Sequence, residues 1–288
     1  MAADLYTISH QDMSWENHQY RIFVAAARQP VTNGARPSVL YVLDGNAQFP
    51  LAVNAVSEQV ATPSDSSTHA PTLPLIVGLG YPEALAYPLE ARARDYTYAA
   101  PGEAFARGGG AATFFRFLHT AVKPYIEKQY HTNPQRQILS GHSFGGLFAL
   151  YVLLQHPDAF THYVIGSPSL WWGNAALVTQ LQTSHSEKGD TNAPSATIPS
   201  VAHSGVQAVK ILQGEYEENP HADPKMTPDR LARMAERKSP VTARELNVWL
   251  RKQDVNSQFE LLAGRNHGGV IPGVISTAVQ TALENSGK

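Results

Sequence analysis

A serine in a glycine-rich turn is the first residue in this sequence whose setting could support chemistry. Residues 141–146 read Gly-His-Ser-Phe-Gly-Gly, which places Ser143 at the centre of a G-x-S-x-G pattern. Such a serine sits on a cramped turn from a strand into a helix, where only small flanking residues fit. The pattern is weak alone, but here it follows a short apolar run and opens a longer one. We therefore predict that Ser143 is a nucleophile and that the backbone N–H of Phe144 binds the oxyanion of a tetrahedral intermediate.

A serine nucleophile needs a general base, and chain order indicates where to look for it. Where a nucleophile occupies this kind of turn, the acid and then the base follow it along the chain. Residues 265–269 read Arg-Asn-His-Gly-Gly after the last expected strand, and the glycines would let this loop approach the turn closely. These observations predict that His267 is the base. His142 leaves the turn on a different side from Ser143, so we expect it to pack or to form a hydrogen bond.

The acid is less well defined, because three carboxylates follow the preceding expected strand. Residues 214–219 read Gly-Glu-Tyr-Glu-Glu-Asn. Any of the three glutamates could orient an imidazole if its side chain turned inward. We favour Glu217 and keep Glu215 and Glu218 as alternatives. A Ser-His dyad without an acid is a further alternative.

Composition excludes several other kinds of chemistry. The 288 residues contain no cysteine, which rules out thiolate nucleophiles, disulfides and Cys-ligated zinc. No histidine pair has zinc-site spacing with a third ligand, so we expect no metal and no cofactor. The 22 Lys and Arg against 24 Asp and Glu provide no basic surface for nucleic acid or an anionic membrane. The expected partner is a small-molecule ester, and the oligomeric state is not predicted.

The elements that must position these residues alternate along the chain. Short apolar runs bounded by Pro, Gly or Asn predict strands, and apolar residues at helical spacing predict helices. We expect strands at 20–27, 38–43, 74–79, 137–140, 160–166, 207–213 and 258–263, and helices at 110–130, after the serine turn, at 228–237, at 241–252 and from near Pro272. This order predicts an α/β fold of the α/β-hydrolase type, with a doubly wound, mostly parallel sheet and helices on both faces.

The same pattern predicts a single domain over residues 1–288, with surface insertions at 61–71 and 183–205. Both insertions are rich in small and polar residues and carry too little apolar surface to offset their ordering entropy. The N-terminus lacks the features of a signal peptide, and no apolar run is long enough to span a bilayer. We therefore expect a cytoplasmic protein, or a periplasmic one if a leader has been removed.

Several stretches in order resemble the "Putative esterase" family, which includes the hydrolases of the siderophores enterobactin, salmochelin and bacillibactin. The resemblance spans nearly the whole chain. It rests on VLYVLDGNAQF at 39–49, VGLGYP at 77–82, RARDYT at 92–97, GGGAATFFRFLHTAVKPYIEKQY at 108–130, LSGHSFGGLFAL at 139–150, SPSLWW at 167–172, GEYE at 214–217 and GRNHGGVIPGVISTA at 264–278.

The resemblance implies roles for further residues. It implies Ser143 and His267 as nucleophile and base, Glu217 as the acid, and Asn46 as the second oxyanion donor beside Phe144. By the same resemblance, Arg92 provides a cation for an anionic substrate, or it pairs with Asp95 to fix a loop. Trp171 and Trp172 form an aromatic wall for a ring-bearing acyl group, or they belong to the core.

Two features depart from the family pattern, namely Tyr98 in place of a proline and the length of the 183–205 insertion. The predicted nucleophile and base favour carboxylic ester hydrolysis through an acyl-serine intermediate, and the resemblance implies trilactone catecholate siderophores as the first substrate. The alternatives are a general carboxylesterase of small acyl or aryl esters and an acyltransferase that uses the same residues. A noncatalytic binding scaffold is a third class, and the retention of both Ser143 and His267 speaks against it.

Overall fold

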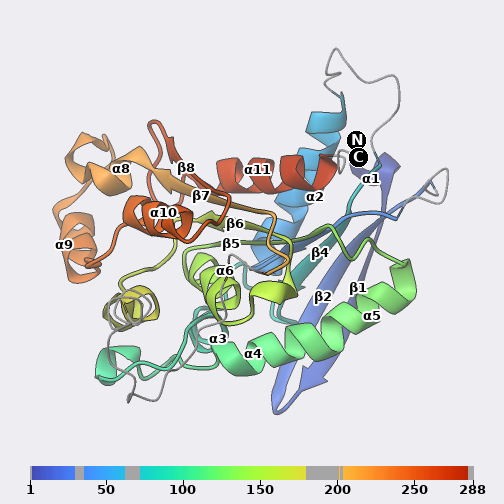
Figure 1. The fold of residues 1–288 in the computed structure, drawn as a ribbon, viewed down its shortest axis with the longest axis horizontal. Coiled ribbons are helices and arrows are strands. Elements are labelled where there is room, and N and C mark those ends of the chain that lie inside the picture. The colour runs from blue at the N-terminus through green and yellow to red at the C-terminus, as the bar shows by residue number, and fades with distance from the viewer. Residues whose placement is uncertain (1, 30–35, 62–71, 180–200, 202–203, 285–288) are drawn as a thin grey trace.

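The computed structural model of the chain describes residues 2–29, 36–61, 72–179, 201 and 204–284. Its described strands form one eight-stranded sheet in the order β1-β2-β4-β3-β5-β6-β7-β8 (Figure 1). The strands are β1 (Tyr6–Trp15), β2 (His18–Ala27), β3 (Val39–Val42), β4 (Leu75–Gly80), β5 (Gln137–His142), β6 (His162–Gly166), β7 (Ala208–Gly214) and β8 (Ser257–Leu262). The six strands from β4 to β8 in this order pair in parallel, whereas β1 and β2 are antiparallel. The expected doubly wound, mostly parallel sheet is confirmed.

Helices cover both faces of the sheet. They are α1 (Ala2–Leu5), α2 (Gly45–Ala61), α3 (Leu89–Tyr96), α4 (Ala111–Phe117), α5 (Lys123–Tyr130), α6 (Phe144–Gln155), α8 (Glu215–Glu218), α9 (Pro228–Glu236), α10 (Ala243–Lys252) and α11 (Ile271–Leu283). Helices α2 and α11 pack on one face, and α3, α4, α6 and α10 pack on the other (Figure 1). The central strands are therefore buried on both faces, which explains why β3, β4 and β5 read as continuous apolar runs.

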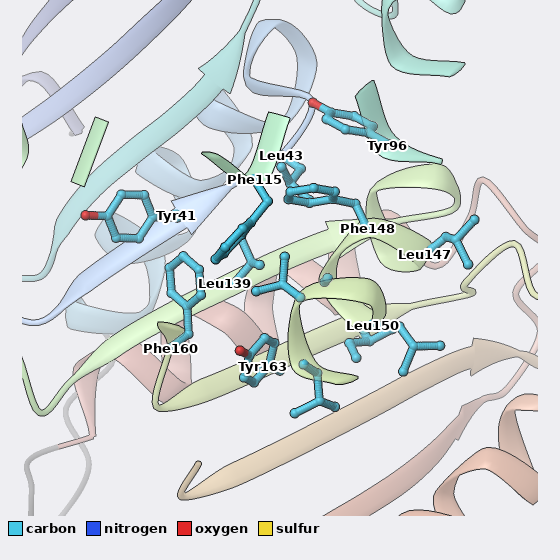
Figure 2. Packing of buried hydrophobic residues seen from close by; sticks show 14 of the residues in the cluster. Tyr41, Leu43, Tyr96, Phe115, Leu139, Leu147, Phe148, Leu150, Phe160 and Tyr163 are labelled. Carbon is cyan, nitrogen blue, oxygen red and sulfur yellow. The ribbon is translucent and has the colours of Figure 1, made fainter. Parts of the chain in front are cut away.

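Two hydrophobic clusters lie on opposite faces of the sheet. Alternate residues of a strand point to opposite faces, so Leu40 joins the cluster under α2 and α11 while Tyr41 joins the cluster under α6. In the second cluster, Leu43 and Leu139 are buried together with Phe148 of α6 (Figure 2). This packing holds α6 firmly on the sheet, and α6 begins at the residue after Ser143.

Strand β1 and helices α2 and α3 are among the elements that our expectations did not include. Strand β1 is an edge strand whose residues are mostly exposed and polar, so it gives no apolar run. Helix α2 begins with a glycine and contains Pro50, and α3 is short and rich in charge.

The expected helix at 110–130 is present as α4 and α5 joined by a π-helical turn at Leu118–Val122, just before Pro124. The wider turn accommodates the proline, whose missing N–H would interrupt a regular α-helix.

The single-domain interpretation remains a prediction. The expected insertions fall almost entirely outside the described residues, at 62–71, 183–200 and 202–203. In the described part of the chain, no helix is both long and apolar enough to cross a membrane.

Candidate active site

Ser143 occupies a strained position between β5 and α6. Its φ of 60° and ψ of −118° lie outside the regions that non-glycine residues normally adopt. The turn has no room for a larger residue before it, because a Cβ on Gly141 would lie 2.3 Å from the carbonyl oxygen of Gly145. A Cβ on Gly146 would lie 2.7 Å from the carbonyl oxygen of Gly166. The glycines of the motif thus allow the backbone to lift Ser143 to the carboxyl edge of the sheet.

A histidine and a glutamate from distant parts of the chain line up with Ser143. The Nε2 atom of His267, in the loop between β8 and α11, lies 3.0 Å from Ser143 Oγ. The Nδ1 atom of the same ring lies 2.7 Å from Glu217 Oε2. The three side chains therefore form a continuous hydrogen-bonded series from hydroxyl to imidazole to carboxylate, although 124 residues separate Ser143 from His267.

The three candidate acids point to three different partners. Glu215 accepts a hydrogen bond from the amide of Gly264, at 2.7 Å, and so ties the start of the histidine loop to α8. Glu218 pairs with the exposed Arg244. Glu217 alone among the three reaches His267, and its side chain is only 12% exposed.

Glu217 is held by further donors on its second oxygen. The hydroxyl of Ser167 donates to Oε1 at 2.5 Å, and the amide of Gly214 donates to the same atom at 2.9 Å. Burial acts to raise the pKa of Glu217, but the hydrogen bonds from His267, Ser167 and Gly214 outweigh it and the pKa is lowered. The carboxylate is therefore ionised at neutral pH and fixed in orientation.

Two serines that sequence reasoning passed over, and His142, lie against this series. Ser167 braces Glu217, and Ser169 lies beside the nucleophile, with its Oγ 3.3 Å from Ser143 Oγ. His142, expected to pack or to form a hydrogen bond, has its Nε2 atom 2.6 Å from the carbonyl oxygen of His267. Because that oxygen can only accept, Nε2 of His142 carries the proton. Burial, aided by the nearby His267, lowers the pKa of His142 to about 3, so its ring stays neutral.

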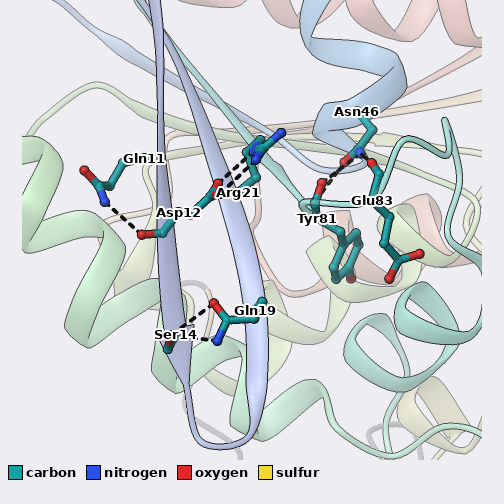
Figure 3. Close-up of polar contacts among 8 residues, drawn as sticks. All are labelled: Gln11, Asp12, Ser14, Gln19, Arg21, Asn46, Tyr81 and Glu83. Carbon is teal, nitrogen blue, oxygen red and sulfur yellow. Dashed lines mark hydrogen bonds and ion pairs between the residues drawn. The ribbon is translucent and has the colours of Figure 1, made fainter.

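The turn after β3 lies directly against the serine turn. A Cβ on Gly145 would lie 3.3 Å from Leu43 Cβ and 3.5 Å from a carboxylate oxygen of Asp44. Asn46 follows in the first turn of α2. Its side-chain amide donates to the carbonyls of Tyr81 and Glu83 and accepts from the amide of Tyr81 (Figure 3). The side chain of Asn46 thus fastens a neighbouring loop, so any part it takes in oxyanion binding falls to its backbone N–H.

Arg92 is buried and paired, which corrects one of our expectations. The Arg92–Asp95 pair is wrong, because Arg92 of α3 bonds both carboxylate oxygens of Asp44 instead. Asp95 is taken by the adjacent Arg94 and by the hydroxyl of Tyr81. Because Arg92 is paired with Asp44, its positive charge is already neutralised by a protein carboxylate, and Arg92 is only 7% exposed.

The two tryptophans have different settings. Trp172 is buried in the core, and its indole N–H donates to the carbonyl of Tyr98 while the hydroxyl of Tyr98 donates back to the carbonyl of Trp172. Tyr98, the departure from the family pattern, therefore braces this loop. Trp171 is only partly buried, and its ring centroid lies 5.8 Å from that of Phe144. Of the two tryptophans, Trp171 is therefore the one that is partly exposed beside Phe144, the residue after Ser143.

The titratable side chains around Ser143 form pairs with one another. Among the described residues, no group of three or more His, Asp and Glu side chains is arranged to hold a metal ion. His267 is bonded to Glu217, and Asp44 is bonded to Arg92. The chemistry that this arrangement can perform is proton transfer from a serine hydroxyl, assisted by nearby backbone amides.

Comparison with known proteins gives a consistent result. A family model described as "Putative esterase" matches residues 17–251. The ferri-bacillibactin esterase BesA of Bacillus subtilis is 32% identical over 282 residues, which cover 94% of this chain and 87% of BesA.

Solved structures show the same fold. The BES protein from Bacillus cereus matches with a TM-score of 0.68 and 26% identity, over 96% of this chain and 95% of that one. The siderophore hydrolase EstB from Aspergillus nidulans matches with a TM-score of 0.78 and 23% identity, over 98% and 96% of the two chains. With the sheet described above, these matches confirm the expected α/β-hydrolase fold.

Proposed function

The chain belongs to the "Putative esterase" family and is a carboxylic ester hydrolase, and from this premise we propose that Ser143, His267 and Glu217 cleave the ester through an acyl-serine intermediate. The observation that carries the proposal is the series of contacts from Ser143 Oγ through both ring nitrogens of His267 to Glu217. Such a series is how an otherwise weak hydroxyl nucleophile is activated.

In the first step, Ser143 Oγ attacks the ester carbonyl and its proton passes to Nε2 of His267. The carbonyl oxygen becomes an oxyanion, for which we propose the N–H groups of Phe144 and Asn46 as donors. The closeness of Leu43 and Asp44 to Gly145 supports this pairing, because it brings the start of α2 next to the start of α6. Glu217 holds the ring so that Nδ1 keeps its proton and Nε2 is free to accept one.

In the second step, the oxyanion collapses, the C–O bond to the leaving alcohol breaks, and His267 gives its proton to that alcohol. Water then attacks the acyl-serine while His267 takes one of its protons. The second tetrahedral intermediate collapses, the bond from the acyl carbon to Ser143 Oγ breaks, His267 returns the proton to Oγ, and the acid is released. The side chain of His267 is 50% exposed. Because water can reach the base, this exposure favours hydrolysis over acyl transfer to an alcohol.

For the ester itself, we propose a siderophore, with trilactone catecholates as the first candidates. The support is the likeness to BesA, whose name gives ferri-bacillibactin as its substrate. The half-buried Trp171 beside Phe144 supports a substrate with a ring near its scissile ester. A general carboxylesterase of aryl or small acyl esters is the competing function.

The deciding experiment compares products by mass spectrometry. The protein is incubated with ferric and iron-free trilactone siderophores and, separately, with a short-chain aryl ester, beside the Ser143→Ala variant. Linear hydrolysis products from the trilactones, absent with the variant, would support the proposal. Intact trilactones beside a cleaved aryl ester would reject the siderophore assignment and leave the general esterase.

A further inference from the structure

Asp44 and Arg92 form a buried ion pair beside Ser143 that the proposed mechanism does not use. The guanidinium meets the carboxylate with Nε and Nη2, the latter at 2.9 Å from Oδ2. The side chain of Asp44 is 1% exposed and that of Arg92 is 9% exposed. A buried pair of this kind is weak evidence for added stability, since desolvation cancels much of the attraction. Its retention next to the site therefore calls for another reason.

Two residues of helix α3 form hydrogen bonds with the turn after β3. Arg92 holds the side chain of Asp44, and the hydroxyl of Tyr96, one turn later on the same helix, accepts a hydrogen bond from the backbone N–H of Asp44 at 3.1 Å. Asp44 has a φ of 55°, a left-handed conformation that costs free energy for a residue with a side chain. The three contacts from α3 are positioned to keep Asp44 in it.

The other side of the turn is equally constrained. A Cβ on Gly45 would lie 2.8 Å from the carbonyl carbon of Gly78, so this residue lies flat against β4. The turn is thus fixed by α3 on one side and by β4 on the other. It ends at Asn46, whose N–H we propose as the second oxyanion donor.

Charge gives the pair a second purpose. The Asp44 carboxylate lies close to Gly145, next to the site where the oxyanion would form. An unpaired anion there would oppose the negative charge of the transition state, and more strongly in a buried site than in water. The guanidinium of Arg92 cancels that charge and also lies 5.9 Å from the ring centroid of Phe144, the residue of the first oxyanion donor.

We propose that Asp44 and Arg92 are positioning residues for oxyanion binding, in which the ion pair holds the Leu43–Asn46 turn against the serine turn. This inference rests on the proposed function of Ser143. In this proposal Arg92 contributes to catalysis by positioning the Leu43–Asn46 turn and does not touch the substrate. Direct binding of an anionic substrate by Arg92 is the competing interpretation. The two readings differ in which kinetic constant changes and for which substrates.

The test compares a neutral and an anionic ester of similar size, such as 4-nitrophenyl butyrate and mono-4-nitrophenyl succinate. For Arg92→Gln and Asp44→Asn, we expect kcat to fall about tenfold to a hundredfold on both esters, with KM within about threefold of the wild type. A loss confined to the anionic ester and expressed in KM would overturn the proposal and assign Arg92 to substrate binding. Unchanged kcat on both esters would also overturn it.

The double variant Asp44→Asn/Arg92→Gln separates holding the turn from cancelling charge. If the pair positions the turn, the double variant stays as slow as the slower single variant. If Arg92 only neutralises Asp44, removing both charges restores kcat, and the positioning role fails.

Two further variants guard against a loss of folding. Tyr96→Phe removes only the hydroxyl that accepts from Asp44, and Arg92→Lys keeps the charge but not the two-point contact. Both are expected to fold, to lower kcat severalfold on both esters and to leave KM nearly unchanged. If Asp44→Asn does not fold, wild-type kcat in these two variants would overturn the proposal.

Asp12→Asn is the matched control, because Asp12 binds Arg21 through the same two guanidinium nitrogens on an exposed hairpin (Figure 3). It should leave both kinetic constants unchanged. Ser143→Ala tells the two proposals apart. Full turnover in that variant would reject the proposed function itself. An inactive Ser143→Ala variant beside an Arg92→Gln variant with wild-type kcat would reject only the positioning role.

Discussion

Glu217→Gln should damage the esterase in a specific way, because the amide would force His267 into the wrong tautomer. In the wild type, Oε1 of Glu217 accepts from Ser167 and Gly214, and Oε2 faces Nδ1 of His267. In the variant, the single carboxamide oxygen would stay with those two donors. The NH₂ group would then face Nδ1, which would have to accept, so the ring proton would move to Nε2.

An imidazole protonated at Nε2 cannot take the proton of Ser143. The same exchange in a buried Ser-His-Asp triad costs about 10⁴ in kcat. Here the ring of His267 is 50% exposed, so water can compete for Nδ1 and relieve part of the defect. We therefore expect a loss of about 10²–10³ in kcat, equivalent to about 3–4 kcal/mol of activation free energy.

The assay is steady-state hydrolysis of a 4-nitrophenyl ester at neutral pH, with folding checked by thermal unfolding. Glu218→Gln is the control, since Glu218 pairs with the exposed Arg244 rather than with His267 and the variant should retain nearly full kcat. A Glu217→Gln variant within about threefold of the wild type would refute the reasoning and leave a Ser143–His267 dyad.

Two further predictions concern the surroundings of the serine. His142 has a pKa lowered to about 3 from an ordinary 6.5, so the unfolded chain binds a proton there that the folded one refuses as the pH falls below about 6. Between about pH 6 and 4, the free energy of unfolding should fall less steeply with falling pH in His142→Gln than in the wild type, by up to about 1.4 kcal/mol per pH unit, as measured by denaturant unfolding. An equal pH dependence in the two proteins would contradict the buried neutral ring. Gly141→Ala places a methyl 2.3 Å from the Gly145 carbonyl and should lower stability by about 1–3 kcal/mol and disrupt turnover, while Gly205→Ala, whose Cβ has no neighbour within 4 Å, should do neither; a stable, active Gly141→Ala would show that the turn is not as tight as described.

The parts of the site that could be predicted are those set by local sterics and chain order. The turn at Ser143 needs glycines at fixed positions, and those glycines are visible in the sequence. The place of His267 follows from the order of strands, because parallel strands bring their carboxyl ends to one edge of the sheet. Both therefore required no knowledge of side-chain direction.

Contacts that depend on side-chain direction could not be predicted. Glu215, Glu217 and Glu218 lie within one turn of helix and yet face three partners, and the sequence does not say which of them meets the histidine loop. Arg92 pairs with a residue 48 positions away, although a carboxylate stood three positions along its own helix. Edge strand β1 was missed for a related reason, since an exposed strand needs no apolar pattern.

The acyl-serine intermediate is the central claim, and trapping it is its most direct test. The protein is treated with an uncharged fluorophosphonate, or mixed rapidly with a 4-nitrophenyl ester and quenched in acid, and then digested and examined by mass spectrometry. The account predicts one added phosphonyl or acyl group on the peptide containing Ser143, and none in Ser143→Ala. Modification at another residue, or an unmodified Ser143 peptide in a protein that still cleaves the ester, would contradict it.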